Sequence, residues 1–236
     1  MKVCLLSNTP DPIKVIYLAC RTCYSKLAPS EMQEVTDEKM VSLIKNTILS
    51  GHHSVLEHAS FSFSVEGVSR ALTHQLVRHR LASYAQQSQR YVEYKEDTLD
   101  FVMPKTIAKN YKDKFDALMK EIFKTYRELV EDGVPAEDAR YLLPNASTTN
   151  IIVTMNFREL MQFSKIRLCY RAQWEILEMV KKMKDEVTTV SQFLANGLQP
   201  KCQHLGYCDE TKPCGCYKFS TSALEVKSER NKLWDM

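Results

Sequence analysis

The stretch "ASFSFSVEGVSRALTHQLVRHR" (residues 59–80) predicts a β-strand followed directly by a helix. In residues 59–65 large apolar side chains alternate with serines, which is typical of a strand with one buried face. After Gly67, Ser69 is suited to cap the helix, because its hydroxyl can accept a hydrogen bond from a free backbone N–H of the first turn. We expect the helix to end near Arg78–Arg80. Its predicted inward-facing residues are Ala71, Leu72 and Leu76.

Two more helices are predicted by apolar residues at three-and-four spacing. The first covers residues 37–51, where Gly51 supplies the C-terminal stop. The second covers residues 111–133, and Gly133 together with Pro135 ends it. The apolar stripes are Met40, Leu43, Ile44 and Ile48 in the first helix, and Phe115, Leu118, Ile122, Tyr126 and Leu129 in the second.

The C-terminal half adds a strand and a long helical pattern. "NIIVTM" (150–155) is a short apolar strand, and the pattern from about Asn156 towards Val187 predicts one long helix. Its buried face comprises Phe157, Leu160, Met161, Ser164 and Leu168. Strands and helices are mixed without a regular βαβ alternation, so we expect an α+β fold. The composition changes at Leu198, which divides the chain into one domain (1–198) and a Cys-rich tail (199–236).

Size and composition exclude several classes of protein. A chain of 236 residues can bury a single core, and 44% hydrophobic with 26% charged residues is ordinary for a soluble globular protein. A net charge of +3 is too weak for a protein that coats nucleic acid. The N-terminus has no secretory signal pattern, and no apolar run reaches the roughly 18 residues of a membrane span. We therefore expect a cytoplasmic protein without a membrane partner, whose eight cysteines are reduced.

Two familiar kinds of site are absent from the sequence. None of the six glycines opens a G-x-G-x-x-G turn or a phosphate loop, so a bound nucleotide must be held by side chains. "GHHSVLEH" (51–58) lacks the zinc-protease patterns, because Ser54 stands where H-x-x-E-H needs histidine. Loop or cap histidines, with Glu57 bonding the backbone, are favoured there over a metal site.

Residues 78–91, "RHRLASYAQQSQRY", combine three arginines with amides and hydroxyls and contain no carboxylate. Guanidinium groups bind phosphate oxygens bidentately, and amides can read the O=C–N–H edge of a base. Gln75 and Arg78 lie three residues apart at the helix end and can reach the same site. The composition suits an anionic nucleotide, and the alternative is a solvated basic face.

Two later arginines are open to a similar interpretation. Arg140 lies at a helix-to-loop corner, where it either points into a cleft or pairs with Glu137. Arg167 lies beside the apolar stripe of the last predicted helix. A half-buried arginine needs a partner, which is either a structural carboxylate or a ligand.

The tail segment "CQHLGYCDETKPCGC" (202–216) is rich in possible metal ligands. Four cysteines and His204 can surround a zinc ion, since three or four thiolates suit tetrahedral zinc. The spacing C-x5-C-x5-C-x-C is not that of a standard zinc knuckle. Reduced, partly exposed thiols are therefore favoured, zinc is the alternative, and no metal is assigned.

Taken in order, these residues resemble the flavin-dependent thymidylate synthases, the ThyX family. The family signature, R-H-R, seven residues and then S, is met by Arg78-His79-Arg80 and Ser88, followed by Arg90-Tyr91. "HHSVLEH" resembles the family's H-x-[S/T]-P-x-E-H loop, and "RYLLP" its arginine-bearing turn. "MNFRELMQFSKIRLCYRAQWEI" resembles its Asn-x-Arg…Arg…A-Q-W-E-I helix. The four motifs extend from about residue 50 to 180.

The resemblance implies a methyltransferase of dTMP biosynthesis that converts dUMP to dTMP. Methylenetetrahydrofolate supplies the carbon, FAD carries the hydride and NADPH reduces the flavin. The implied fold is a central β-sheet flanked by helices, in a homotetramer whose active sites are shared between subunits. By position, the residues implied to contact FAD are Ser54, Arg78, His79, Arg80, Asn156, Arg158 and Gln162. Those implied to contact dUMP are Gln75, Arg78, Gln86, Ser88, Gln89, Arg90, Arg140 and Arg167.

The resemblance gives Arg167 the catalytic role of stabilising the ionised N3 of uracil. An arginine beside a developing imide anion lowers its energy and makes C5 a better nucleophile. Ser88 is assigned to binding, because no evident base activates it. Val55 stands where the family has proline, and Gln86 where some members have glutamate.

Two rival functions come from other classes. One is a nucleic-acid-binding module that uses residues 78–91, with Tyr84 and Tyr91 stacking on bases. The other is a zinc hydrolase built on the histidine loop or the tail.

Overall fold

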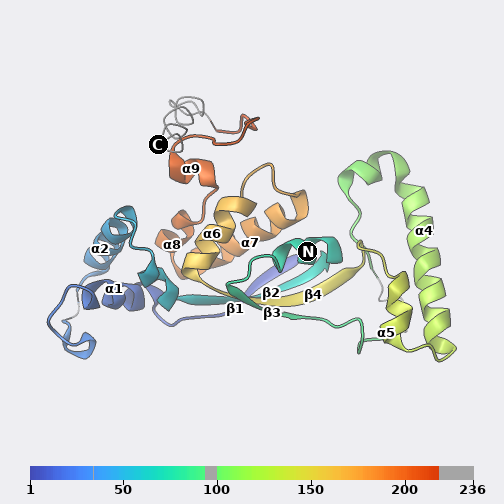
Figure 1. Ribbon diagram of the computed structural model, residues 1–236, viewed down its shortest axis with the longest axis horizontal. Helices are drawn as coiled ribbons and strands as arrows, with labels where there is room; N and C mark the ends of the chain where they lie inside the picture. The colour runs from blue at the N-terminus through green and yellow to red at the C-terminus, as the bar shows by residue number, and fades with distance from the viewer. Residues whose placement is uncertain (34, 94–99, 218–236) are drawn as a thin grey trace, which may run out of the picture. The chain divides into compact units, whose positions relative to one another are not determined.

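The computed structural model describes residues 1–33, 35–93 and 100–217 (Figure 1). Its strands form one sheet in the order β1-β2-β4-β3. The strands are β1 (Lys2–Asn8), β2 (Ser60–Ser69), β3 (Ala82–Gln86) and β4 (Thr148–Asn156). Helices and strands follow one another along the chain without a βαβ repeat, which confirms the α+β prediction.

The chain divides into two compact units, each built from two separate segments. The first unit combines residues 1–3 with 64–153, and the second combines 4–63 with 154–236. The division of the sequence into a domain (1–198) and a tail (199–236) stays a prediction, and residues 218–236 of that tail lie outside the described residues.

The first unit contains the helix that follows β2. The helical elements of this unit are α3 (Arg70–Leu76), α4 (Lys105–Glu131), α5 (Ala136–Ala139) and the 3-10 helix η3 (Arg140–Leu142). The Ser69 hydroxyl accepts from the backbone N–H of Leu72 at 3.0 Å, which confirms the predicted cap. Leu72 and Leu76 are buried, but Ala71 is exposed. Ala71 directly precedes the buried Leu72, and neighbouring positions on a helix point in different directions.

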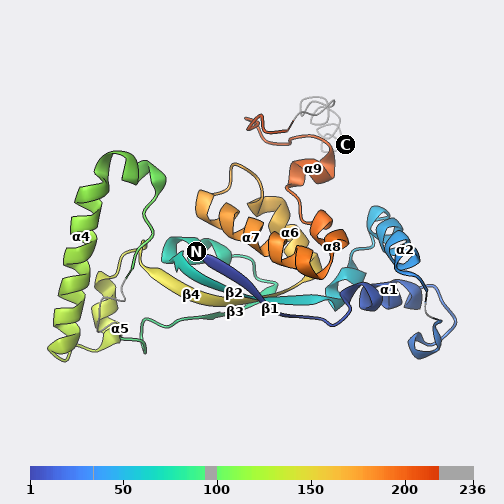
Figure 2. The same cartoon turned by 180° about the vertical axis from the view of Figure 1, so that it is seen from behind.

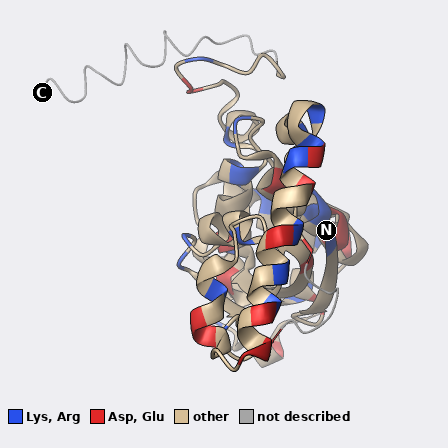
Figure 3. Cartoon of the chain, turned by 90° about the vertical axis from the view of Figure 1, so that its right-hand side faces the viewer, with Lys and Arg blue, Asp and Glu red and all other residues tan. Residues whose placement is uncertain are grey.

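Helix α4 is confirmed, but its buried face differs from the predicted stripe. The buried residues are Met119, Phe123 and Tyr126, whereas Leu118 is 54% exposed. The ring centre of Phe101 lies 5.6 Å from that of Phe115 and 6.2 Å from that of Phe123. Packing against Phe101 therefore turns inward the face of α4 on which Phe115 and Phe123 lie, because residues four apart share one face of a helix. The backbone of α4 is non-helical at Tyr111, so a short segment from Lys105 precedes a kink at the predicted start of the helix, and Gly133 follows the helix with a φ of +88°. Residues of both charge signs are spread along the length of α4 (Figure 3).

The second unit contains the remaining helices, and α1 packs against α2 (Figure 2). They are α1 (Pro12–Thr22), η1 (Pro29–Glu31), α2 (Asp37–Leu49), η2 (Ser54–His58), α6 (Phe157–Arg167), α7 (Trp174–Val190), α8 (Gln192–Gly197) and α9 (Lys201–Leu205). Met40 and Ile44 are the buried residues of α2, and Gly51 follows it with a φ of +82°. The predicted helix over 37–51 and its glycine stop are therefore confirmed.

The single long helix predicted from Asn156 to Val187 is wrong, because the chain breaks into α6 and α7. The Gln173 side chain accepts from the backbone N–H groups of Glu175 and Ile176, both at 3.0 Å, and so starts a new helix. The predicted apolar face of α6 is confirmed, since all of its members are buried: Phe157, Leu160, Met161, Ser164 and Leu168.

Both predicted strands are found, and β2 has the expected buried face, since Phe61, Phe63 and Val65 are fully buried. In β4 the alternating residues Ile151, Val153 and Met155 are buried as well. In the second unit the rings of Phe61 and Phe157 lie 6.0 Å apart, which places the start of α6 against β2. Within the described residues, no helix has both the length and the hydropathy needed to cross a bilayer.

Candidate active site

The R-H-R turn (residues 78–80) lies between α3 and β3 in the first unit. The Tyr84 hydroxyl is 2.9 Å from the carbonyl oxygen of Leu76 and 2.7 Å from that of His79. One side chain of β3 therefore contacts both the end of α3 and the middle of the turn. Tyr84 is half-buried in this role, so it does not present a free ring for base stacking as the nucleic-acid hypothesis required.

Arg78 and Arg80 are exposed on this turn. Neither guanidinium has a hydrogen-bond or ion-pair partner in residues 1–33, 35–93 and 100–217. Two positive charges two residues apart on a fixed turn can bind an anionic group without first losing an internal partner.

Two side-chain amides, Gln86 at the end of β3 and Gln89 just after it, are each hydrogen-bonded at one end. Gln86 donates from Nε2 to the hydroxyl of Thr73 at 3.0 Å and lies 3.4 Å from that of Thr149. Gln89 accepts on Oε1 from Arg70 at 3.0 Å. Among the described residues, the Gln86 carbonyl oxygen and the Gln89 amide nitrogen have no partner. One acceptor and one donor are thus available to a ligand.

A carboxylate of α5 pairs with an arginine of residues 78–91, a segment that contains no carboxylate itself. Glu137 pairs with the Arg90 guanidinium, which also lies 5.2 Å from the centre of the Tyr91 ring. Arg140 donates from Nε to the Glu137 backbone carbonyl at 3.0 Å, so of its two predicted positions the one beside Glu137 is found, through the backbone of that residue. The Ser88 hydroxyl accepts from the Arg90 backbone N–H at 3.1 Å. Glu137 therefore positions both arginines.

In the second unit, η2 packs against α6 and presents Ser54 at the surface. Glu57, one turn later, pairs with Arg158 of α6, so the predicted bond from Glu57 to the backbone is wrong. Val55, which replaces the family's proline, is 5% exposed and contributes to the core. Gln162 is exposed four residues after Arg158, on the same face of α6.

Asn156 begins α6. Its side-chain oxygen accepts from the backbone N–H of Glu159 at 2.9 Å, which satisfies one free donor of the first turn. Glu159 itself is buried, and that burial raises the pKa of its carboxyl group. Asn156, which is a predicted FAD contact, therefore caps the N-terminus of α6.

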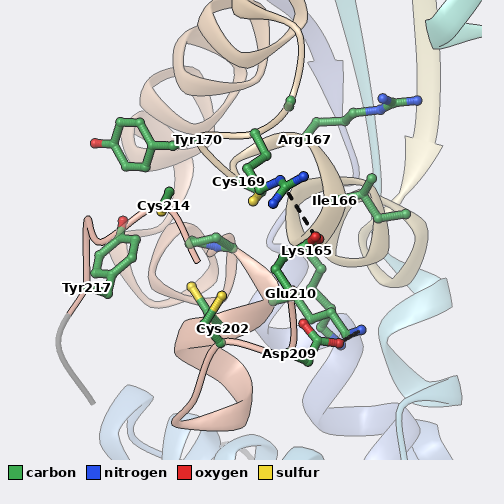
Figure 4. A pocket seen from close by; sticks show the side chains of 15 residues that line it. Lys165, Ile166, Arg167, Cys169, Tyr170, Cys202, Asp209, Glu210, Cys214 and Tyr217 are labelled. Atoms are coloured by element: carbon green, nitrogen blue, oxygen red, sulfur yellow. Dashed lines mark hydrogen bonds and ion pairs between the residues drawn. The ribbon is translucent and has the colours of Figure 1, made fainter. Parts of the chain in front are cut away.

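Arg167 is the last residue of α6 and lines a cavity of about 470 Å³, together with Lys165 and Tyr170 (Figure 4). Burial lowers the pKa of both Arg167 and Lys165. Lys165 has no ion-pair or hydrogen-bond partner in the part of the chain that the structure describes. An arginine stays protonated despite such a shift, so the cavity wall is positively charged.

Comparison with known proteins shows which family the chain resembles. The family described as thymidylate synthase complementing protein matches residues 4–191. A flavin-dependent thymidylate synthase of Geobacter sulfurreducens is 47% identical over 96% of this chain and 97% of its own length. One of Pyrococcus abyssi is 40% identical over 92% of this chain and 94% of its own.

The chain belongs to the flavin-dependent thymidylate synthase (ThyX) family.

The ThyX fold is also found among solved structures. Helicobacter pylori ThyX complexed with FAD and dUMP superposes with a TM-score of 0.66 at 25% identity, over 84% of this chain and all of that one. A second Helicobacter pylori ThyX structure with FAD and dUMP gives 0.68 at 26% identity, over 84% of this chain and 99% of that one.

The residues that the ThyX resemblance implied fall into two sets, one in each unit. The first unit carries Gln75, Arg78, His79, Arg80, Gln86, Ser88, Gln89, Arg90 and Arg140. The second carries Ser54, Asn156, Arg158, Gln162 and Arg167. Their individual roles stay predictions.

Sequence reasoning missed the groups that hold these residues in place. The Tyr84 hydroxyl and the Glu137 carboxylate are the clearest examples. Tyr84 is on a strand whose alternation is visible in "ASYAQ", and this was the one available signal.

Proposed function

We propose that this chain methylates dUMP to dTMP, with methylenetetrahydrofolate as carbon donor, FAD as hydride carrier and NADPH as reductant. Family membership and the FAD and dUMP named for Helicobacter pylori ThyX support this proposal. The observation that carries it is the R-H-R turn, where Arg78 and Arg80 are exposed, held in place and unpaired among the described residues.

Each unit by itself offers groups that fit part of FAD. In the first unit Arg78 and Arg80 supply charge for phosphates, and in the second Arg158 and Gln162 present a guanidinium and an amide on one face of α6. Because Glu57 and Arg158 are each 46% exposed, their ion pair is worth no more than about 1 kcal/mol and can be exchanged for a ligand contact. When bound, FAD carries the hydride that NADPH supplies.

The residues after β3 fit dUMP. The unpaired Gln86 oxygen and Gln89 nitrogen can read a donor and an acceptor on the uracil edge. Arg90 and Arg140, both positioned by Glu137, supply charge for the phosphate. Ser88 binds rather than attacks, since no His, Lys or carboxylate among the described residues is hydrogen-bonded to its hydroxyl.

Arg167 assists the carbon–carbon bond-forming step. Its half-buried guanidinium stabilises negative charge that develops on the uracil N3, and the resulting anion makes C5 a stronger nucleophile. Partial desolvation strengthens this interaction, because the effective dielectric around the charge is lower than in water.

We propose further that the enzyme acts as a cytoplasmic homotetramer with shared active sites. Large apolar side chains next to the predicted dUMP residues support a subunit contact there. Leu81 is 73% exposed, Tyr91 76% and Tyr141 85%.

The first test is a visible spectrum of the purified protein before and after dUMP is added. A flavin band that dUMP perturbs is expected. A colourless protein that takes up no FAD on reconstitution would overturn the proposal.

The second test is the variant Arg167→Ala. Its rate of dTMP formation should fall about 10²- to 10³-fold, the usual cost of losing one donor to a developing anion, while FAD stays bound. Arg21→Ala, at an exposed arginine of α1, is the control and should retain full activity. Equal activity of the two variants would remove Arg167 from this role.

A further inference from the structure

Two exposed thiols, Cys214 and Cys216, lie on either side of a single glycine in the segment after α9. Both are free, and Cys214 also lines the cavity at the end of α6 (Figure 4). Gly215, between them, has a φ of +75°, a left-handed conformation that glycine adopts far more readily than other residues. The chain therefore turns at Gly215 between two thiols that are accessible from solvent.

The turn brings the two cysteines into hydrogen-bond contact. The backbone N–H of Cys216 donates to the Cys214 sulfur at 3.5 Å. The Cys216 thiol is placed to donate either to the Cys214 carbonyl oxygen, at 3.9 Å, or to the Cys214 sulfur. The Cys214 sulfur is thus an acceptor, and the thiol beside it is a donor.

These hydrogen bonds give the two sulfurs opposite tendencies to ionise. The pKa of the Cys214 thiol is lowered, chiefly by the Cys216 backbone N–H and then by the Cys216 side chain, because both stabilise the thiolate. The pKa of the Cys216 thiol is raised, chiefly by the Cys214 side chain. Cys214 is therefore the nucleophile of the pair. An accessible thiolate next to a second, resolving cysteine is the usual arrangement of a redox-reactive site.

Two other cysteines of the chain show what sets this pair apart. Cys23 is also exposed, but its sulfur donates to the Ala19 carbonyl oxygen at 3.4 Å, which favours the protonated thiol. Cys202 lines the same cavity as Cys214, but burial is the main cause that raises its pKa. Exposure without an N–H donor, as at Cys23, provides an internal control for the reactivity of Cys214.

We propose that Cys214 and Cys216 form a peroxide-reactive dithiol, a redox modification site in the wall of the cavity at the end of α6. The Cys214 thiolate attacks one oxygen of a hydroperoxide and becomes a sulfenic acid as the O–O bond breaks. The other oxygen leaves as water or an alcohol, with the proton that the Cys214 thiol had released.

The second step closes the disulfide. The Cys216 sulfur gives up its proton and attacks the Cys214 sulfur, and the S–O bond breaks as the S–S bond forms. The hydroxide that leaves takes this proton and becomes water. Two thiols are thus oxidised and one hydroperoxide is reduced, and a dithiol reductant reverses the change. This proposal does not depend on the flavin or on dTMP formation.

The test treats the full chain with one equivalent of hydrogen peroxide, alkylates the remaining thiols, and digests the protein with trypsin and Asp-N. Peptide 209–218 contains Cys214 and Cys216 as its only cysteines. Its mass should fall by two hydrogens, whereas Cys23 should remain alkylated, and dithiothreitol should restore both thiols. A disulfide from Cys214 to another cysteine, or a peptide 209–218 no more oxidised than Cys23, would overturn the proposal.

Variants separate the roles of the two sulfurs. Cys216→Ser should stop at the sulfenic acid of Cys214, which dimedone traps as a stable adduct. Cys214→Ser should form neither the disulfide nor a dimedone adduct on Cys216. Cys23→Ser is the control and should form the disulfide at an unchanged rate. An adduct on Cys216 with none on Cys214 would overturn the assignment of the nucleophile.

The glycine turn can be tested without removing either thiol. A Cβ at Gly215 meets no atom of the described residues within 4 Å, so only the backbone opposes a substitution there. Gly215→Val should slow disulfide closure about 5- to 30-fold, which corresponds to the about 1 to 2 kcal/mol of strain that a left-handed conformation imposes. Gly215→Asn should keep most of the rate, because asparagine tolerates this conformation. Equal closure rates in the two variants would overturn the role of the turn.

Discussion

Replacing Tyr84 by phenylalanine removes the hydroxyl that holds the R-H-R turn and leaves the ring in place. This hydroxyl lies within hydrogen-bond distance of the carbonyl oxygens of Leu76 and His79. Because it has a single proton, it donates fully to only one of them at a time. The variant therefore loses about one hydrogen bond.

One such bond contributes about 0.5 to 1.5 kcal/mol to folding. We expect the free energy of unfolding of Tyr84→Phe to fall by about 1 kcal/mol. If the bond also keeps Arg78 and Arg80 in their binding geometry, a loss of about 1 kcal/mol lowers FAD affinity by about fivefold, since about 1.4 kcal/mol corresponds to a factor of ten.

Urea denaturation measures the first effect, and titration of the apoprotein with FAD measures the second. Tyr111→Phe is the matched control, because the Tyr111 hydroxyl is on the exposed side of α4 and has no hydrogen-bond partner among the described residues. Unfolding energy and FAD affinity that match the control would refute the role given to Tyr84.

Two other predictions concern single side chains that make a defined hydrogen bond in the structure. Ser88→Ala should raise the KM for dUMP and retain part of kcat, as steady-state kinetics can show; complete loss of turnover with dUMP still bound would identify Ser88 as a nucleophile instead. Asn156→Ala should lower the free energy of unfolding by about 1 kcal/mol, because the α6 cap is lost, whereas Asn156→Ser should keep most of it. Equal urea midpoints for the two Asn156 variants would contradict the capping role.

The features that sequence patterns predicted are local ones. Strand β2, the Ser69 cap and the buried face of α6 each depend on residues a few positions apart, where periodicity and capping rules apply. The ion pairs at the site join residues 47 and 101 positions apart, so no local pattern could indicate that Arg90 meets Glu137 or that Arg158 meets Glu57.

Two further misses have different causes. Strand β3, "ASYAQ", contains small and polar residues with no fully buried side chain, so the strand signal is weak. The break between α6 and α7 is made by Gln173, a residue outside the usual set of N-caps. Both depend on tertiary context rather than on intrinsic preference.

One backbone contact has a consequence for how the chain folds during synthesis. The N–H of Leu5 donates to the carboxylate of Glu186 at 2.8 Å, across 181 positions. At about 5 to 20 residues per second, a ribosome needs about 10 to 35 s to make the residues between them. During that interval the Leu5 N–H cannot have its native partner, so this contact forms only after most of the chain has been made, although β2, the sheet neighbour of β1, is available much earlier.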